Sequence, residues 1–290
     1  MKRALRFVEC RQLPLQERIS IQTLYSFTKS PILLSPPHHH HVYVALNKKT
    51  PLASIVANDE QLEAFHSIQL SQATYNDRHV FHGLLNRITY ERSRETKHPI
   101  TYYLQEHDTQ NQDKFRVYEA AGFQYFHQTN TYRLPLIPCE KNTHKYWTLE
   151  LMNYAKRAEW LVSRNTYSHT LPEAVPMTDE RFAQESRQQT LFYTLKWCQQ
   201  PIGFMKVRLH MYHLSIQEMH LECEAPQIRE AISFLQHKFF YGFRYIDEAQ
   251  ISATSLQPDL TYALRQHGAQ VSNASSYVFT QEVPPTPIYS

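Results

Sequence analysis

The sequence predicts an α/β protein with mixed β-sheets, in which one fold is present twice in tandem. The 290 residues exceed the roughly 100–200 that one domain usually takes. Hydrophobic residues make up 42% of the chain and charged residues 20%, as in folded rather than disordered proteins. The same order of strands and helices, β-α-β-β-β-α-β-α-β, can be followed once in each half. That order is typical of a mixed sheet with helices on its faces.

In the first half, hydrophobic periodicity and turn residues define each element. Val80, Leu84, Leu85 and Ile88 recur at the spacing of an amphipathic helix. A turn at 47–51 joins two strands as a hairpin. Gly122 ends the last helix, because glycine is the usual residue just after a helix C-terminus. The expected strands are 4–13, 42–46, 52–57, 64–70, 100–105 and 123–134, and the expected helices are 16–28, 79–94 and 111–121.

The second half repeats this order of elements. Gln199, Gln200 and Pro201 form its hairpin turn, and Gly268 ends its last helix. The expected strands are 147–152, 190–197, 202–209, 214–222, 248–253 and 276–280, and the expected helices are 156–168, 228–241 and 260–267.

Two landmarks indicate an internal duplication. The hairpin prolines Pro51 and Pro201 stand 150 positions apart, and the helix-ending glycines Gly122 and Gly268 stand 146 apart. Nearly equal offsets are typical of a repeated unit; the alternative is a coincidence of common turn residues. We therefore predict one domain over 1–137 with the cofactor site, a linker over 135–145, and a degenerate second domain over 145–290.

Composition excludes several classes of protein. A net charge of +3 without a dense Lys/Arg stripe does not favour nucleic acid as a partner. No apolar run approaches the ~20 residues of a membrane span, and the start of the chain lacks the apolar region of a signal peptide. A homo-oligomer stays an open alternative, and no motif predicts a metal site. The widely spaced cysteines predict reduced thiols and a cytoplasmic protein; they are Cys10, Cys139, Cys198 and Cys223.

The strongest local motif runs from Asn111 to Phe123, NQDKFRVYEAAGF. It resembles the N-x-x-A-x-x-L-Y-E-K-x-G-F signature of the GNAT N-acetyltransferase superfamily, and the element order over residues 4–134 is also similar to that family's. Lys114 stands where the family usually has alanine. The residues on the register of the signature are Asn111, Val117, Tyr118, Glu119, Gly122 and Phe123.

The resemblance implies two residue roles. Tyr118 would protonate the CoA thiolate as it leaves, since a phenol with a pKa of about 10 is a weak acid beside a strong acceptor. Asn111 would contact the cofactor arm. The alternative for Tyr118 is a packing role in the core. Glu60, Glu63 and His66 are candidates for a general base, although a surface or hairpin position is the simpler interpretation of each.

The family also carries a phosphate loop, [Q/R]-x-x-G-x-[G/A], at the start of its central helix. Free N–H groups and the helix dipole bind a pyrophosphate there. The resemblance places this loop at Arg78, His79, Val80, Phe81, His82 and Gly83. Phe81 replaces the central glycine, and Asn76 or Asp77 can cap the helix.

The second copy departs further from the family pattern. Its loop would be 227–232, with no glycine and with Glu230 to repel a phosphate. By register from Gly268, Gln257 replaces the asparagine and Leu264 replaces the tyrosine. This copy is predicted to have lost CoA chemistry.

Two functions follow. The first is an enzyme that transfers an acetyl group from acetyl-CoA, or another acyl-CoA, to an amine of a small molecule or peptide, mainly by positioning the reactants. The second is a catalytically inactive GNAT-like binding module for CoA, another ligand or a protein partner, because fold does not fix function.

Overall fold

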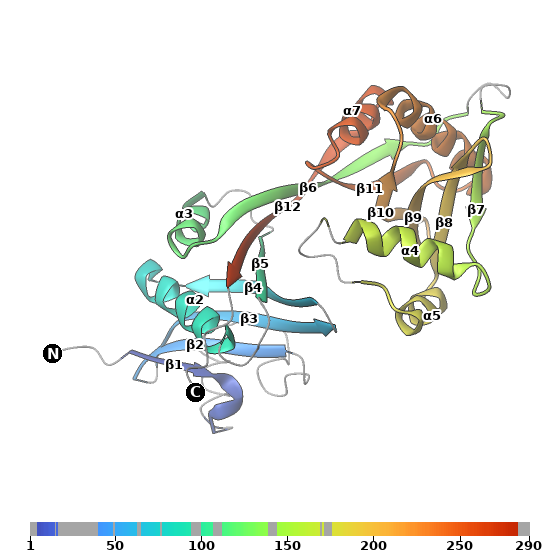
Figure 1. Cartoon of the computed structure of the whole chain (residues 1–290). Helices are drawn as coiled ribbons and strands as arrows, with labels where there is room; N and C mark the ends of the chain where they lie inside the picture. The colour runs from blue at the N-terminus through green and yellow to red at the C-terminus, as the bar shows by residue number, and fades with distance from the viewer. Residues whose placement is uncertain are drawn as a thin grey trace. The chain divides into compact units, whose positions relative to one another are not determined.

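The chain forms two compact units in a computed structural model (Figure 1). Unit 1 is Met1–Phe126 with Ser276–Ser290, and unit 2 is His127–Ser275. The structure describes residues 5–14, 16, 40–48, 50–62, 65–75, 77–93, 100–106, 112–138, 144–168, 170 and 176–283.

Unit 1 is a mixed sheet with strand order β1-β2-β3-β4-β5-β12. Neighbouring strands are antiparallel except β4 and β5, which are parallel. The strands are β1 (Leu5–Glu9), β2 (His40–Asn47), β3 (Thr50–Leu62), β4 (Phe65–Tyr75), β5 (Ile100–Glu106) and the second half of β12 (Gln270–Val283), and a short 3-10 helix, Cys10–Gln12, follows β1.

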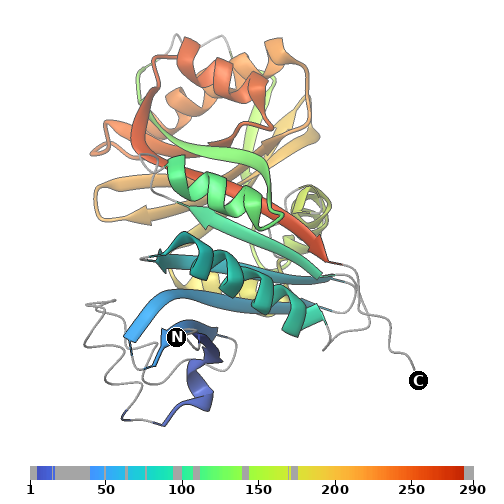
Figure 2. The same cartoon turned by 90° about the vertical axis from the view of Figure 1, so that its left-hand side faces the viewer.

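Two helices of unit 1 lie on the sheet. Figure 2 shows α2 (Arg78–Ser93) running across one face, with α3 (Gln112–Ala120) beside it. The apolar stripe of α2 that the sequence predicted is fully buried, from Val80 to Ile88. Burying each such side chain contributes about 1.5–3 kcal/mol, which fixes the helix on the sheet.

Unit 2 is a second mixed sheet, with strand order β6-β11-β10-β9-β8-β7. Again one central pair, β10 and β11, is parallel and the others are antiparallel. Its strands are β6 (Gln124–Pro135), β7 (Trp147–Leu151), β8 (Thr190–Trp197), β9 (Gln200–His210), β10 (His213–Leu221) and β11 (Glu248–Thr254), and its helices are α4 (Arg157–Ser168), α5 (Asp179–Arg187), α6 (Ala225–Gly242) and α7 (Pro258–Gln266).

Helices cover both faces of the unit 2 sheet. Neighbouring strand residues point to opposite faces, and Phe204 belongs to the cluster under α4 and α5 while Met205 belongs to the cluster under α6 and α7. The mixed α/β class predicted from the sequence is confirmed.

The repeated landmarks have the same structure in both units. Gly122 and Gly268 follow α3 and α7 with φ of 88° and 81°, the left-handed region that favours glycine. Pro51 and Pro201 each lie one step past a hairpin, next to a register shift in the ladder. The turn of the second hairpin is Cys198–Gln199, with φ of 49° and 69°, one residue earlier than the sequence suggested.

The closing strands are exchanged between the halves of the sequence. In unit 1, the strand beside β5 is Tyr277–Val283 of β12, paired antiparallel with Ile100–Glu106. In unit 2, the strand beside β11 is Thr129–Pro135 of β6, paired with Glu248–Thr254. The predicted ranges 1–137 and 145–290 stay a prediction about which segments are copies, because the compact units divide the chain differently.

Candidate functional site

The predicted phosphate loop lies at the start of α2, and a carboxylate occupies it. Asp77 Oδ1 accepts hydrogen bonds from the N–H groups of His79 at 2.9 Å and Val80 at 3.2 Å. The N–H of Phe81 donates to the Asp77 carbonyl oxygen at 3.0 Å. The capping role that the sequence allowed for Asp77 is confirmed, and these three N–H groups are engaged by the chain itself.

The side chains after this cap serve packing. Phe81 is completely buried and Val80 is 6% exposed, so neither side chain lies on the surface where a cofactor would bind. A Cβ added to Gly83 would lie 3.1 Å from Cζ of Phe7. Gly83 therefore allows β1 to pack closely on α2.

The two polar residues of the same segment hold α3 against α2. Arg78 Nη2 lies 2.5 Å from Asp113 Oδ2, with both side chains half exposed. His82 Nε2 is 2.9 Å from the carbonyl oxygen of Ala120. Arg78 and His82 thus link the first two turns of α2 to both ends of α3.

Tyr118 lies inside the core of unit 1. Its side chain is completely buried, with the ring of Phe81 6.2 Å away and the ring of Phe279 5.4 Å away, centroid to centroid. The sequence left open a catalytic and a packing role for Tyr118, and this position satisfies the packing role. A catalytic role for it stays a prediction.

The structure does not describe the side chains of the other predicted site residues of the first copy. Asn111 and Glu63 are outside the described residues, and the side chains of Glu60 and His66 are too. Their roles stay predictions.

In the second copy, a carboxylate also occupies the corresponding helix start. Glu224 precedes α6 and forms a capping box with Gln227: the Glu224 N–H donates to Gln227 Oε1 at 3.2 Å, and the Glu224 side chain reaches the Gln227 N–H. Pro226 has no N–H to offer. The segment 227–232, read from the sequence as a loop, lies within α6, because the helix starts at Ala225.

The last helix of unit 2 has no phenol at the position of Tyr118. Leu264 is fully buried there. Gln257 precedes α7, and its Nε2 donates to the Met219 carbonyl oxygen at 3.1 Å. These residues serve packing and hydrogen bonding within the unit, as the predicted loss of CoA chemistry in this copy requires.

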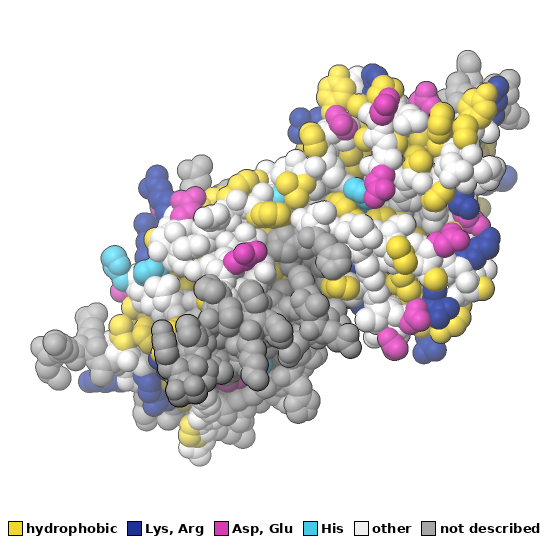
Figure 3. Space-filling view, viewed as in Figure 1, with side chains coloured by type: hydrophobic (Ala, Val, Ile, Leu, Met, Phe, Trp, Pro, Cys, Tyr) yellow, Lys and Arg dark blue, Asp and Glu magenta, His cyan; other side chains and the backbone are white. Residues whose placement is uncertain are grey.

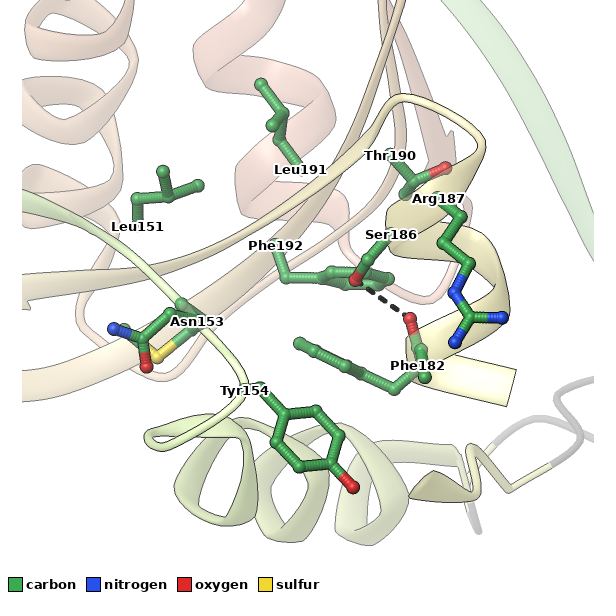
Figure 4. A pocket seen from close by; sticks show the side chains of 11 residues that line it. Leu151, Asn153, Tyr154, Phe182, Ser186, Arg187, Thr190, Leu191 and Phe192 are labelled. Carbon is green, nitrogen blue, oxygen red and sulfur yellow. Dashed lines mark hydrogen bonds between the residues drawn. The ribbon is translucent and has the colours of Figure 1, made fainter. Parts of the chain in front are cut away.

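A pocket that the sequence did not predict opens in unit 2 between the end of β7, α5 and the start of β8 (Figure 4). Its volume is about 500 Å³. Residues that line it include Leu151, Met152, Phe182, Arg187, Thr190 and Phe192. The sequence analysis did not predict this pocket, because it did not predict helix α5.

A cap signal could have identified α5. Thr178 Oγ1 accepts the N–H of Arg181 at 3.2 Å, and Asp179 and Glu180 occupy the first turn. A threonine followed by two acids is typical of a helix start. The apolar spacing in this short helix is weak, since Phe182 is its only fully buried side chain.

Ion pairs surround the pocket. Arg157 Nε lies 2.7 Å from Asp179 Oδ1. Glu150 pairs with Lys156 and with Lys196, and hydrogen bonds from Lys156 and then Lys196 lower the pKa of Glu150 to about 2. These carboxylates are therefore ionised and matched by cations at neutral pH.

A buried ion network lies under α4. Arg164, 4% exposed, donates through Nε to Glu218 Oε2 at 3.0 Å. Lys206 Nζ lies 2.6 Å from Glu185 Oε2 and 3.6 Å from Glu218 Oε1. Burial raises the pKa of Glu218, but Arg164 and Lys206 more than offset this and hold it below its usual value. The network ties Arg164 of α4 and Glu185 of α5 to Glu218 and Lys206 of the sheet.

Surface features add little to these sites. Acidic and basic side chains alternate on the face of unit 2 seen in Figure 3, without a large patch of one sign. In the part of the chain that the structure describes, no helix is long and apolar enough to cross a membrane. The described cysteines Cys10, Cys198 and Cys223 form no disulfide bond with one another.

Comparison with known proteins identifies the fold. No protein-family model matches the chain, and no curated protein sequence does. Solved structures do match. A GCN5-related N-acetyltransferase from Sphaerobacter thermophilus has a TM-score of 0.54 at 12% identity, covering 99% of this chain and 98% of that one. A tandem GNAT protein from the clavulanic acid biosynthesis pathway has a TM-score of 0.51 at 10% identity, covering 98% and 100%.

A third solved structure also matches nearly the whole chain at low sequence identity. A GCN5-related N-acetyltransferase from Anabaena variabilis has a TM-score of 0.54 at 10% identity, covering 96% of this chain and 72% of that one. The tandem GNAT fold predicted from the sequence is confirmed by these structures.

Proposed function

From the tandem GNAT fold, we propose that the protein is a ligand-binding module that does not anchor acetyl-CoA by its pyrophosphate. One observation carries the proposal: at both helix starts where this fold could hold a pyrophosphate, a carboxylate of the chain is already in place, Asp77 before α2 and Glu224 before α6.

A lower limit can be set on the binding free energy that a pyrophosphate would lose by displacing the Asp77 carboxylate from the helix start. A pyrophosphate would have to displace a helix cap, which contributes about 1 kcal/mol. It would also meet the Asp77 charge, at about 1 kcal/mol for unit charges 4 Å apart in water and about 4 kcal/mol at a protein surface. Together these terms weaken binding by at least about thirtyfold.

The alternative is the transferase predicted from the sequence. It would use acetyl-CoA as co-substrate and acetylate an amine of a small molecule or peptide in the cytoplasm, with Tyr118 as general acid. One observation favours it: Tyr118 lies on the side of α3 that faces Phe81 of α2, beside the helix that would carry the cofactor. For this reaction the thioester would have to reach a ring that is now completely buried.

Calorimetric titration with acetyl-CoA separates the two functions. The wild type should give no saturable heat up to millimolar cofactor. Asp77→Asn removes the charge and keeps a cap, so it should bind more tightly than the wild type. Glu91→Gln is the matched control, since Glu91 pairs with Arg87 near the other end of the same helix. Micromolar binding by the wild type would contradict the proposal, and transfer of the acetyl group to an amine would then be tested directly.

A further inference from the structure

We infer that the pocket of unit 2 between β7, α5 and β8 binds a small carboxylate with an apolar body. This inference deepens the proposed function, on which it rests, by naming the site and the class of ligand. The volume of about 500 Å³ lies within the range of small-molecule sites, about 300–1,000 Å³.

The floor of the pocket is aromatic. The rings of Phe182 and Phe192 stack with centroids 4.2 Å apart and planes 25° apart, and both side chains are 2% exposed or less. Figure 4 shows the two rings side by side, extending from α5 and β8 into the space between them. Trp160 lies behind, 4.7 Å from Phe192. These rings pack against each other and close the base of the pocket, so an apolar ligand would contact the accessible side chains of Leu151, Ala183 and Leu191 above them.

The mouth of the pocket is positively charged. Arg187, at the end of α5, lines it, and no Asp or Glu does. Within the described residues Arg187 has no ion pair.

The neighbouring carboxylates are already neutralised. Asp179 is held by Arg157, Glu150 by two lysines, and Glu185 by Arg181 and Lys206. An anion at the mouth therefore meets the charge of Arg187 without a competing acid among these residues. A guanidinium binds a carboxylate through paired N–H donors.

The remaining polar side chains do not oppose this choice. Ser186 Oγ donates to the carbonyl oxygen of Phe182 at 2.8 Å, so its hydroxyl hydrogen is used within the helix. Arg187 is then the group that would pair with the carboxylate of a ligand. Thr190 is 6% exposed and lies beside Arg187 in Figure 4. The lining thus combines the cation Arg187 and the uncharged polar side chains of Asn153 and Tyr154 with apolar side chains, and it contains no acid.

The test uses three probes of one shape: 3-phenylpropionate, its neutral amide, and 3-phenylpropylamine. Binding is followed by NMR of labelled methyl groups in the full chain. Met152 and Ala183 line the pocket, so their methyl signals report occupancy directly. The carboxylate should shift both signals and bind about tenfold more tightly than the amide, and the amine should bind most weakly.

Variants assign the preference to Arg187. Arg187→Gln should remove the tenfold preference for carboxylate over amide, and Arg187→Lys should retain part of it. Arg181→Gln is the matched control on the same helix, since Arg181 pairs with Glu185 and does not line the pocket; it should keep the preference. Ala183→Phe fills the pocket and should abolish binding of all three probes.

The two proposals fail separately. Equal binding of carboxylate and amide, no shift of Met152 and Ala183 at millimolar probe, or an undiminished preference in Arg187→Gln would overturn the inference about the pocket. Acetyl-CoA binding that leaves these two methyl signals unchanged would instead contradict the proposed function.

Discussion

Unit 2 should fold as the fragment 127–275 and should not fold as the fragment 145–290. The first fragment contains every strand of the unit 2 sheet, whereas the second lacks the part of β6 that pairs with β11. The second fragment therefore loses one closing strand. The resulting loss of unfolding free energy can be estimated from the register of β6 on β11.

The lost strand makes seven residue pairs with β11, from Glu248↔Pro135 to Thr254↔Thr129. At about one backbone hydrogen bond per pair and about 1 kcal/mol each, this is about 7 kcal/mol. Tyr132 and Leu134, each 1% exposed, add about 1.5–3 kcal/mol apiece. The total of about 10 kcal/mol is comparable to the whole stability of a domain, about 5–15 kcal/mol.

Urea unfolding followed by far-UV and near-UV circular dichroism measures this difference. The fragment 127–275 should give a cooperative transition, and 145–290 should lack a native near-UV signal or associate through the open β11 edge. A monomeric 145–290 fragment as stable as 127–275 would refute the reasoning, because β12 would then close the sheet in place of β6.

Three further predictions concern stability. Gly122→Ala should destabilise the protein by about 1–2 kcal/mol in urea, because φ is 88° and the new Cβ would lie 2.9 Å from Gln281 Nε2; Gly242→Ala, with open space around it, should not, and equal effects would disprove the strain. Arg164→Ala should cost about 1.5–3 kcal/mol, because it removes the charged hydrogen bonds of a guanidinium that is 4% exposed while Lys206 stays 3.6 Å from Glu218; Arg164→Met with Glu218→Met should cost less, and no loss in the single variant would contradict this. Glu150, whose pKa is depressed in the folded state, stabilises it above the ordinary value of 4.5, and this is lost as pH falls toward about 2. Glu150→Gln should therefore reduce the change of the unfolding free energy across that pH window by at most about 1 kcal/mol after solvent screening, and an unchanged pH profile of this free energy would argue against the ion pairs.

Local signals predicted much of this fold. Gly122 and Gly268 mark real helix ends, and Pro51 and Pro201 mark equivalent hairpins, since turn chemistry depends on a few adjacent residues. The buried stripe of α2 follows from periodicity alone. These features are encoded within one or two turns of the chain.

Features set by distant contacts were not predictable. Gly83 was interpreted as a phosphate-loop glycine, but its reason is Phe7 of β1, which is far away in sequence. For Tyr118 the sequence allowed a catalytic role and a packing role, and these differ only in what surrounds the ring. The strand exchange was invisible because β6 and β12 have similar strand patterns, and the pairing partner of a strand is decided by long-range contacts.

The exchange of closing strands also dictates an order of events during synthesis. Unit 2 leaves the ribosome as one uninterrupted stretch and can complete its sheet as soon as residue 275 has emerged. The first strands of unit 1 are synthesised before unit 2, but its sheet is completed last. The reason is that β5 has no partner strand on its outer side until Tyr277–Val283 has been synthesised. For the time needed to translate about 170 residues, at roughly 5–20 residues per second, the nascent chain carries an exposed strand edge. This is the stage at which chaperones would be needed most.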